Sequence, residues 1–341
     1  MLFFLPLHVL LRLSTVPVAT AAADSSLGSK AQSLAALTLP PQQPSFSTFS
    51  LELLLPPAYP VLATPINLPP PCESALPPSS SAECFASSME ALNVTFEDCG
   101  TPYTICRCGD AEMTMDTAIR RLGQVPVGLR RYVATVLALA EGTGEARAYT
   151  VESGDIHFFG ECELDTWVHE STHAYDFANP NAWQSSAEGW AQAIDADTCV
   201  PDLYSQTNII EDFAQLSVIM IYTLLHSGSL PPGFSAGCMQ HQLNFMSALD
   251  AYVPGVLFGN NCNIIDNGPT ARHTESPATL DPSRTFTTFP VPKQPSLSSL
   301  QDMPTGIINS GGGADTNGVI PASGGLGWTT IYCLGALIWL L

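Results

Sequence analysis

The chain has 341 residues, only 12% of them are charged, and its formal net charge at pH 7 is -20. No basic cluster is available to follow a phosphate backbone, so nucleic acid is excluded as a partner. Ten cysteines and 29 prolines favour a secreted chain with disulfides and extended segments. The length allows one sizeable core with appendages.

Residues 1–23 predict a secretory signal peptide. The stretch is mostly apolar and ends in small residues, as signal-peptidase sites require. Its one charge, Arg12, lies inside the apolar run and not at the start, which departs from the usual pattern. The segment is also too short and interrupted for a membrane span.

Residues 24–71 are rich in proline and serine. Dense prolines block helices and central strands, so this stretch predicts a linker or a pro-segment without its own core. Its leucine-rich run, residues 51–55, either docks on the following domain as a strand or makes a plain surface contact.

Residues 72–265 predict the folded domain. Its first part is cysteine-rich, and Cys106 and Cys108 form a C-x-C pair that indicates two half-cystines more than a metal site. Asn93 begins an N-x-T sequon, which predicts an exposed glycan in a secreted chain. Hydrophobic spacing then predicts helices over 111–122 and 126–140, followed by strands over 147–152 and 155–160.

A short motif in the middle of this domain carries the chemistry. His169 and His173 are four residues apart in a segment free of proline and glycine, so on a helix they share one face. Two imidazoles one turn apart can bind one metal ion, and Glu170 between them can take a proton from a metal-bound water. The alternative is two ordinary helix histidines. We expect one Zn²⁺ as cofactor.

The uncharged neighbours of this motif make it resemble the active-site helix of the zincins, the zinc metallopeptidases. The resemblance implies an α+β, mostly helical fold with a small sheet. It also implies an edge strand before the helix that pairs with an extended substrate. Residues 156–159 stand where that strand is expected.

A catalytic zinc needs a third protein ligand. Asp176 and Asn179 occupy the places where metzincins have glycine and histidine, which excludes that pattern. We favour Glu211, which opens a predicted helix over 208–225 that is apolar after its first turn. The alternative role for Glu211 is a capping box with Asn208. The other candidates are Glu188, the second choice, then Asp195 and Asp197, with His226 and His241 as outsiders.

The E-D-F-A segment that begins at Glu211 resembles the gluzincins, which implies that Tyr204, seven residues earlier, donates a hydrogen bond to the oxyanion. The string over 96–108 resembles secreted fungal proteins with a later H-E-x-x-H, some of them described as conidiation-associated. That resemblance covers roughly 72–262. Asp165, Asp176 and Asp212 are each able to orient a ligand imidazole, and the sequence does not choose among them.

The C-terminal part predicts surface attachment. Residues 266–310 indicate a Ser/Thr/Pro-rich stalk. Residues 311–341 combine small residues, a polar spacer and an apolar tail, which is typical of a GPI-attachment signal with Ser310 as the attachment residue. Removing the tail would take Cys333 and leave nine cysteines, so at least one thiol would be free or paired outside the chain.

These features give two functional hypotheses. The first is a GPI-anchored cell-surface zinc metalloendopeptidase with Glu170 as general base and a peptide or protein substrate. It would lie on the plasma membrane or cell wall, with the GPI lipid as its membrane partner. The second is a non-catalytic GPI-anchored cell-wall or adhesion protein with a degenerate zincin domain.

Overall fold

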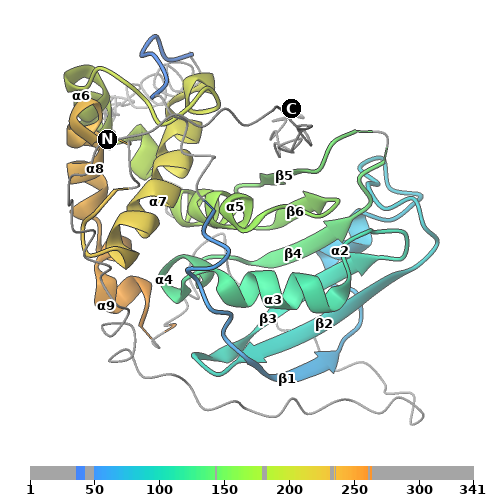
Figure 1. Ribbon diagram of the computed structural model, residues 1–341. Coiled ribbons are helices and arrows are strands. Elements are labelled where there is room, and N and C mark those ends of the chain that lie inside the picture. Colours follow the sequence, from blue (N-terminus) through green and yellow to red (C-terminus); the bar gives the residue numbers. More distant parts are fainter. Residues whose placement is uncertain are drawn as a thin grey trace, which may run out of the picture.

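The computed structural model describes residues 36–42, 50–142, 144–178, 183–230, 234, 236–259 and 262. Within them a six-stranded mixed sheet has the order β1-β2-β3-β4-β6-β5, with helices packed around it (Figure 1). The predicted α+β class is confirmed. Among the described residues, no helix combines the length and apolar character needed to cross a membrane.

The sheet combines two kinds of pairing. Antiparallel pairing joins β1 to β2 and β2 to β3, parallel pairing joins β3 to β4 and β4 to β6, and β5 closes one edge antiparallel to β6. The strands are β1 Pro60–Pro65, β2 Met89–Phe96, β3 Cys99–Cys108, β4 Thr135–Leu139, β5 Arg147–Thr150 and β6 Ile156–Phe159.

The helices lie between and after the strands. Short 3₁₀ turns connect several of them: η2 Gln184–Ser186, η3 Ser205–Thr207, η4 Ala236–Cys238 and η5 Asp250–Tyr252. The helices are α2 Pro70–Ser74, α3 Met115–Gln124, α4 Val127–Arg130, α5 Leu164–Phe177, α6 Glu188–Ala196, α7 Ile209–Leu225, α8 Gln240–Ser247 and α9 Pro254–Leu257.

The two faces of the sheet bury different cores. Side chains alternate along each strand, so Val136 and Ala138 of β4 join the larger core beneath α3, α5 and α7. Leu137 and Leu139 join a smaller core on the other face, near α2. The two cores therefore share the sheet and are formed by alternate residues.

Disulfides tie the smaller core together. Cys72 pairs with Cys106 and Cys84 with Cys108, so both members of the C-x-C pair are half-cystines. Two further bridges in the described residues join Cys99 to Cys262 and Cys199 to Cys238. Cys162 is buried and belongs to none of these bridges.

The predicted helix over 126–140 is wrong beyond Arg130. The chain leaves α4 and enters β4, in which every residue is buried. A central parallel strand is covered on both faces and reads as a continuous apolar run, which spacing does not separate from a buried helix. The helix expected over 111–122 is α3, which begins later because Thr114 caps it by accepting from the Thr117 amide.

The strand over 156–159 is not at the edge. It pairs with β4 on one side and β5 on the other, so β5 is the edge strand next to α5. The two predicted strands do form a hairpin, but the order in which they join the sheet depends on the distant β4. Strand order is not encoded in the hairpin itself.

The structure describes some of the other predicted segments, and the rest lie outside the described residues. In the 24–71 stretch, Leu51 and Leu55 are buried in the larger core and residues 60–65 form β1, so this part packs on the domain. Residues 51–55 form turns and no strand. Asn93 lies half-buried within β2, where Thr104 Oγ1 donates to its side-chain oxygen at 3.0 Å. The predicted signal peptide, stalk and GPI signal lie outside the described residues.

Candidate metal site

Two helices bring three ligand atoms together beside the sheet. His169 and His173 lie one turn apart on α5, and Glu211 lies in the first turn of α7, which packs against α5 (Figure 1). Glu211 Oε2 is 3.0 Å from His169 Nε2 and 3.2 Å from His173 Nε2, and the two Nε2 atoms are 3.0 Å apart. We call these three residues the metal triad.

Local sequence explains how Glu211 reaches the histidines. Asn208 has extended backbone and begins α7, and its side-chain oxygen accepts from the amides of Ile210 at 2.9 Å and Glu211 at 3.0 Å. Asn208 is thus the helix cap expected in the alternative interpretation. The Glu211 carboxylate does not complete a capping box, because it is directed at His169 and His173.

The other candidate ligands lie elsewhere. Glu188 is exposed and accepts from Gln192 at 2.9 Å on α6, and Asp195 is also exposed. Asp197 accepts from the amides of His241 and Gln242, and His226 contacts the Tyr222 carbonyl. Of the candidate ligands, the structure places only Glu211 against the two histidines.

A side chain that the sequence analysis missed orients His169. Gln215 Oε1 lies 3.1 Å from His169 Nδ1, and Gln215 Nε2 donates to Asp202 Oδ2 at 2.7 Å. Since an amide oxygen only accepts, Nδ1 carries the proton and Nε2 presents its lone pair to the triad. Gln215 lies four residues after Glu211, one turn along α7, and this spacing could have identified it.

The three acids proposed for that orienting role have other partners. Asp165 accepts from the Leu51 amide at 3.0 Å, and Asp176 accepts from the amide and hydroxyl of Ser185. Both carboxylate oxygens of Asp212 are buried without a hydrogen-bond partner among the described residues. Burial, together with the nearby charges of Asp202 and Asp197, raises the pKa of Asp212 well above its usual value.

The triad attracts positive charge. Burial opposes a charged His173, but the Glu211 carboxylate outweighs it and raises the His173 pKa to about 9. Burial would likewise raise the Glu211 pKa, yet His173 and His169 hold it well below its usual value. The triad therefore offers an anionic oxygen and two imidazole nitrogens in a buried place.

The donor set and its size fit zinc. Zinc binds histidine nitrogen at about 2.0–2.1 Å in tetrahedral sites, which separates ligand atoms by about 3.3 Å. The three separations in the triad, 3.0 to 3.2 Å, come close to that value. His173 Nδ1 departs from the usual pattern, since it is buried without a partner among the described residues.

Glu170 and Tyr204 also reach the triad. Thr150 Oγ1 lies 2.7 Å from Glu170 Oε2 and 3.0 Å from the Glu170 carbonyl, and burial raises the Glu170 pKa. The Tyr204 ring centre is 5.5 Å from that of His169, and burial together with the Glu211 charge raises the Tyr204 pKa. A cavity beside them is lined by Thr150, Glu170, His173, Tyr204 and Glu211.

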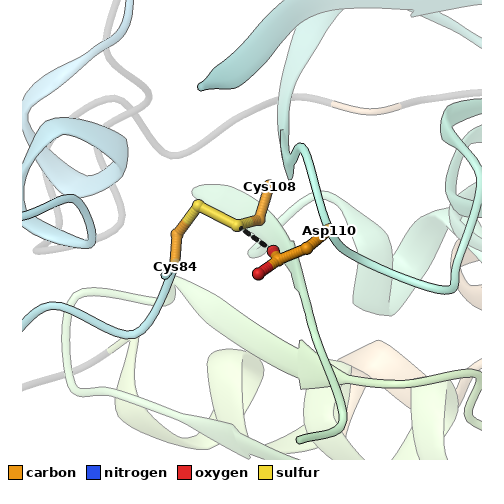
Figure 2. Close-up of side chains that lie close together, drawn as sticks. All are labelled: Cys84, Cys108 and Asp110. Carbon is orange, nitrogen blue, oxygen red and sulfur yellow. Dashed lines mark hydrogen bonds between the residues drawn. A yellow bond between two sulfur atoms is a disulfide. The ribbon is translucent and has the colours of Figure 1, made fainter. Parts of the chain in front are cut away.

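A second group of possible ligands fails the same test. Cys84, Cys108 and Asp110 lie close together, with Asp110 Oδ1 2.6 Å from Cys108 Sγ (Figure 2). The two sulfurs are joined in a disulfide, so neither is a thiolate that could bind a metal. In the metal triad, by contrast, none of the three ligand atoms is used in a covalent cross-link.

Comparison with known proteins decides the family. The family model for conidiation-specific protein Con-13 matches residues 54–262, more than half of the chain. The chain belongs to the Con-13 family. Conidiation-specific protein 13 of Neurospora crassa is 32% identical over 166 residues, which cover 47% of this chain and 47% of that protein. The chain thus spans about half the length of this curated relative. No solved structure matches the chain.

This finding corrects the family and activity inferred from the motif. The matching family is Con-13 and not a metallopeptidase family, so the predicted gluzincin membership is wrong. The zinc metalloendopeptidase hypothesis, with its hydrolase assignment, is therefore wrong as well. A four-residue histidine spacing reports what a helix face can bind, and peptide hydrolysis does not follow from it.

Proposed function

We propose that this Con-13 protein is a non-catalytic, zinc-binding protein of the cell surface. The observation that carries the proposal is the metal triad, in which two histidine nitrogens and one carboxylate oxygen converge within 3.2 Å. His169, His173 and Glu211 would hold one Zn²⁺, with Gln215 fixing the tautomer of His169. When bound, zinc would supply a positive charge that replaces a proton among three acceptors and ties α5 to α7.

The absence of catalysis in this proposal is supported by the surroundings of Glu170. Its carboxylate accepts from Thr150 at 2.7 Å and is only 3% exposed. The family match to Con-13, which is not a metallopeptidase family, also supports it. We describe the domain as zincin-like in arrangement, with a histidine pair on one helix, a glutamate on another and a sheet beside them, but degenerate in function.

We further propose an extracellular, GPI-anchored location on the plasma membrane or cell wall, in a wall or adhesion role. The signal-like residues 1–23 and the small-residue, spacer and apolar-tail pattern of 311–341 support it. The four disulfides agree with folding in an oxidising compartment.

Metal analysis of the purified protein tests zinc binding. The parent should carry one zinc per chain, and His169→Ala should lose it because one of three ligands is gone. His241→Ala is the matched control, since its side chain is 59% exposed and lies off the triad. A zinc-free parent, or full zinc in His169→Ala, would contradict the proposal.

Cleavage assays test the non-catalytic part separately. The zinc-loaded parent should leave a diverse peptide library intact, and Glu170→Gln should give the same digest pattern as the parent. Zinc-dependent cleavage that disappears in Glu170→Gln would refute this part and leave zinc binding standing.

A further inference from the structure

A short N-terminal segment is hydrogen-bonded to the loop beside the metal triad. Residues 36–42, which we call the strap, lie before the range matched by the Con-13 family model. They pack along residues 200–206, which we call the site loop. Leu37 and Leu39 face inward against the larger core, whereas Thr38 between them is exposed.

The strap bonds both ends of the site loop. At one end the Gln42 amide donates to the Val200 carbonyl at 2.8 Å and the Val200 amide donates to the Pro40 carbonyl at 3.0 Å. At the other end the Leu37 amide donates to the Gln206 carbonyl at 2.9 Å, and Gln206 Nε2 donates to the Leu39 carbonyl at 2.6 Å. The strap therefore spans the loop from its first residue to its last.

Between those two ends the site loop supplies two groups to the triad. Asp202 accepts from Gln215, which in turn fixes His169. Tyr204 lies against the His169 ring and hydrogen-bonds Glu211. If the loop moved, both His169 and Glu211 would lose contacts that hold them in place.

Other contacts fix the loop less completely. The Cys199–Cys238 disulfide holds the chain just before the loop, and the Asp202 carboxylate accepts from the amide and hydroxyl of Ser205 inside it. The Gln206 end leads into α7 through the 3₁₀ turn η3. Unlike these contacts, the strap forms hydrogen bonds with both Val200 and Gln206.

We propose that the strap is a positioning element of the metal site: by holding the site loop, it keeps Asp202 and Tyr204 in place and so tightens zinc binding. The inference rests on the proposed zinc function. It predicts that zinc affinity depends on residues more than 120 positions before the first ligand in the chain.

Proline substitutions in the full chain test the strap. The double variant Leu37→Pro/Gln42→Pro removes two donated hydrogen bonds, one at each end, because proline has no amide hydrogen. Thr38→Pro is the matched control, because the Thr38 amide makes no hydrogen bond within the described residues. We expect the zinc Kd to rise about 10- to 100-fold in the double variant, as for lost outer contacts to metal ligands, and to stay unchanged in the control.

Hydrogen exchange at the Val200 amide reports strap release without reference to zinc, and it should accelerate in the double variant only. Faster exchange with an unchanged Kd would overturn the strap proposal and leave zinc binding intact. Unchanged exchange would show that these bonds do not hold the loop, which would also overturn it. A parent protein that binds no zinc would refute the proposed function itself and remove the basis of the strap's role.

Discussion

Two histidine clusters lie on opposite faces of the same sheet edge and differ in how their protons are arranged. On the helix side is the metal triad. On the other side, His157 of β6 lies 2.6 Å from one Glu83 oxygen, and the Tyr149 hydroxyl donates to the other oxygen at 2.6 Å. The Tyr149 ring also stacks on His157, with centres 4.5 Å apart. We call this the His157 cluster.

The difference lies in the balance of donors and acceptors. In the His157 cluster a ring nitrogen and a phenol O–H meet the two carboxylate oxygens of Glu83, so both oxygens have a partner. In the metal triad two imidazole nitrogens and one carboxylate oxygen lie 3.0 to 3.2 Å apart, so three possible ligand atoms share one proton or one cation. Both clusters contain histidine and glutamate, but of the two only the metal triad directs three possible ligand atoms at one point.

Removing the anionic ligand should have the largest effect. Glu211→Gln should lower zinc affinity on the order of 100-fold or more, since a neutral amide replaces a buried anion. Zinc titration against a competing chelator measures it, and the exposed Glu188→Gln is the control. Full affinity in Glu211→Gln with loss in Glu188→Gln would reverse the assignment.

Asp165 on α5 should make the helix side sensitive to pH. Burial raises its pKa to about 6 from the ordinary 3.8, although the Leu51 amide opposes this. The native state then binds more protons than the unfolded chain between about pH 4 and 6, so stability falls as pH rises through this window. Asp165→Asn should remove that slope and stabilise the protein at pH 7 by on the order of 1–3 kcal/mol.

Urea unfolding across pH 4–7 measures the Asp165 effect. Asp195→Asn, at an exposed position, should keep the slope of the parent. A parent whose stability is flat over this window would contradict the raised pKa.

The His157 cluster should contribute only to stability. Its pH dependence should be opposite to that of Asp165. Burial would raise the Glu83 pKa, but the hydrogen bond and charge of His157 outweigh it and lower the value. The stabilisation is present above about pH 4.5 and is lost as pH falls through the folded pKa. Glu83→Gln should therefore cost about 1 kcal/mol at pH 7 and leave the zinc Kd unchanged. A zinc affinity that falls with Glu83→Gln would show that the two faces are coupled.

Local patterns in the sequence were reliable where one element decides the outcome. The i, i+4 spacing places His169 and His173 on one helix face wherever the helix packs. Asn208 caps α7 as its residue type suggests. The hairpin of β5 and β6 likewise depends on a turn between neighbouring strands.

The sequence by itself determined the histidine pair and the cysteine-rich module, because these depend on neighbours along the chain. The helix pattern favoured Glu211 over Glu188, but only tertiary packing places its carboxylate beside the histidines, since the contact between α5 and α7 joins residues 42 positions apart. Tertiary packing also made residues 135–139 a strand, because β3 and β6 pair with it on its two sides. Gln215 and Asp202 acquire their role in the same way: a hydrogen bond acts over about 3 Å, and only the folded chain brings such distant residues that close.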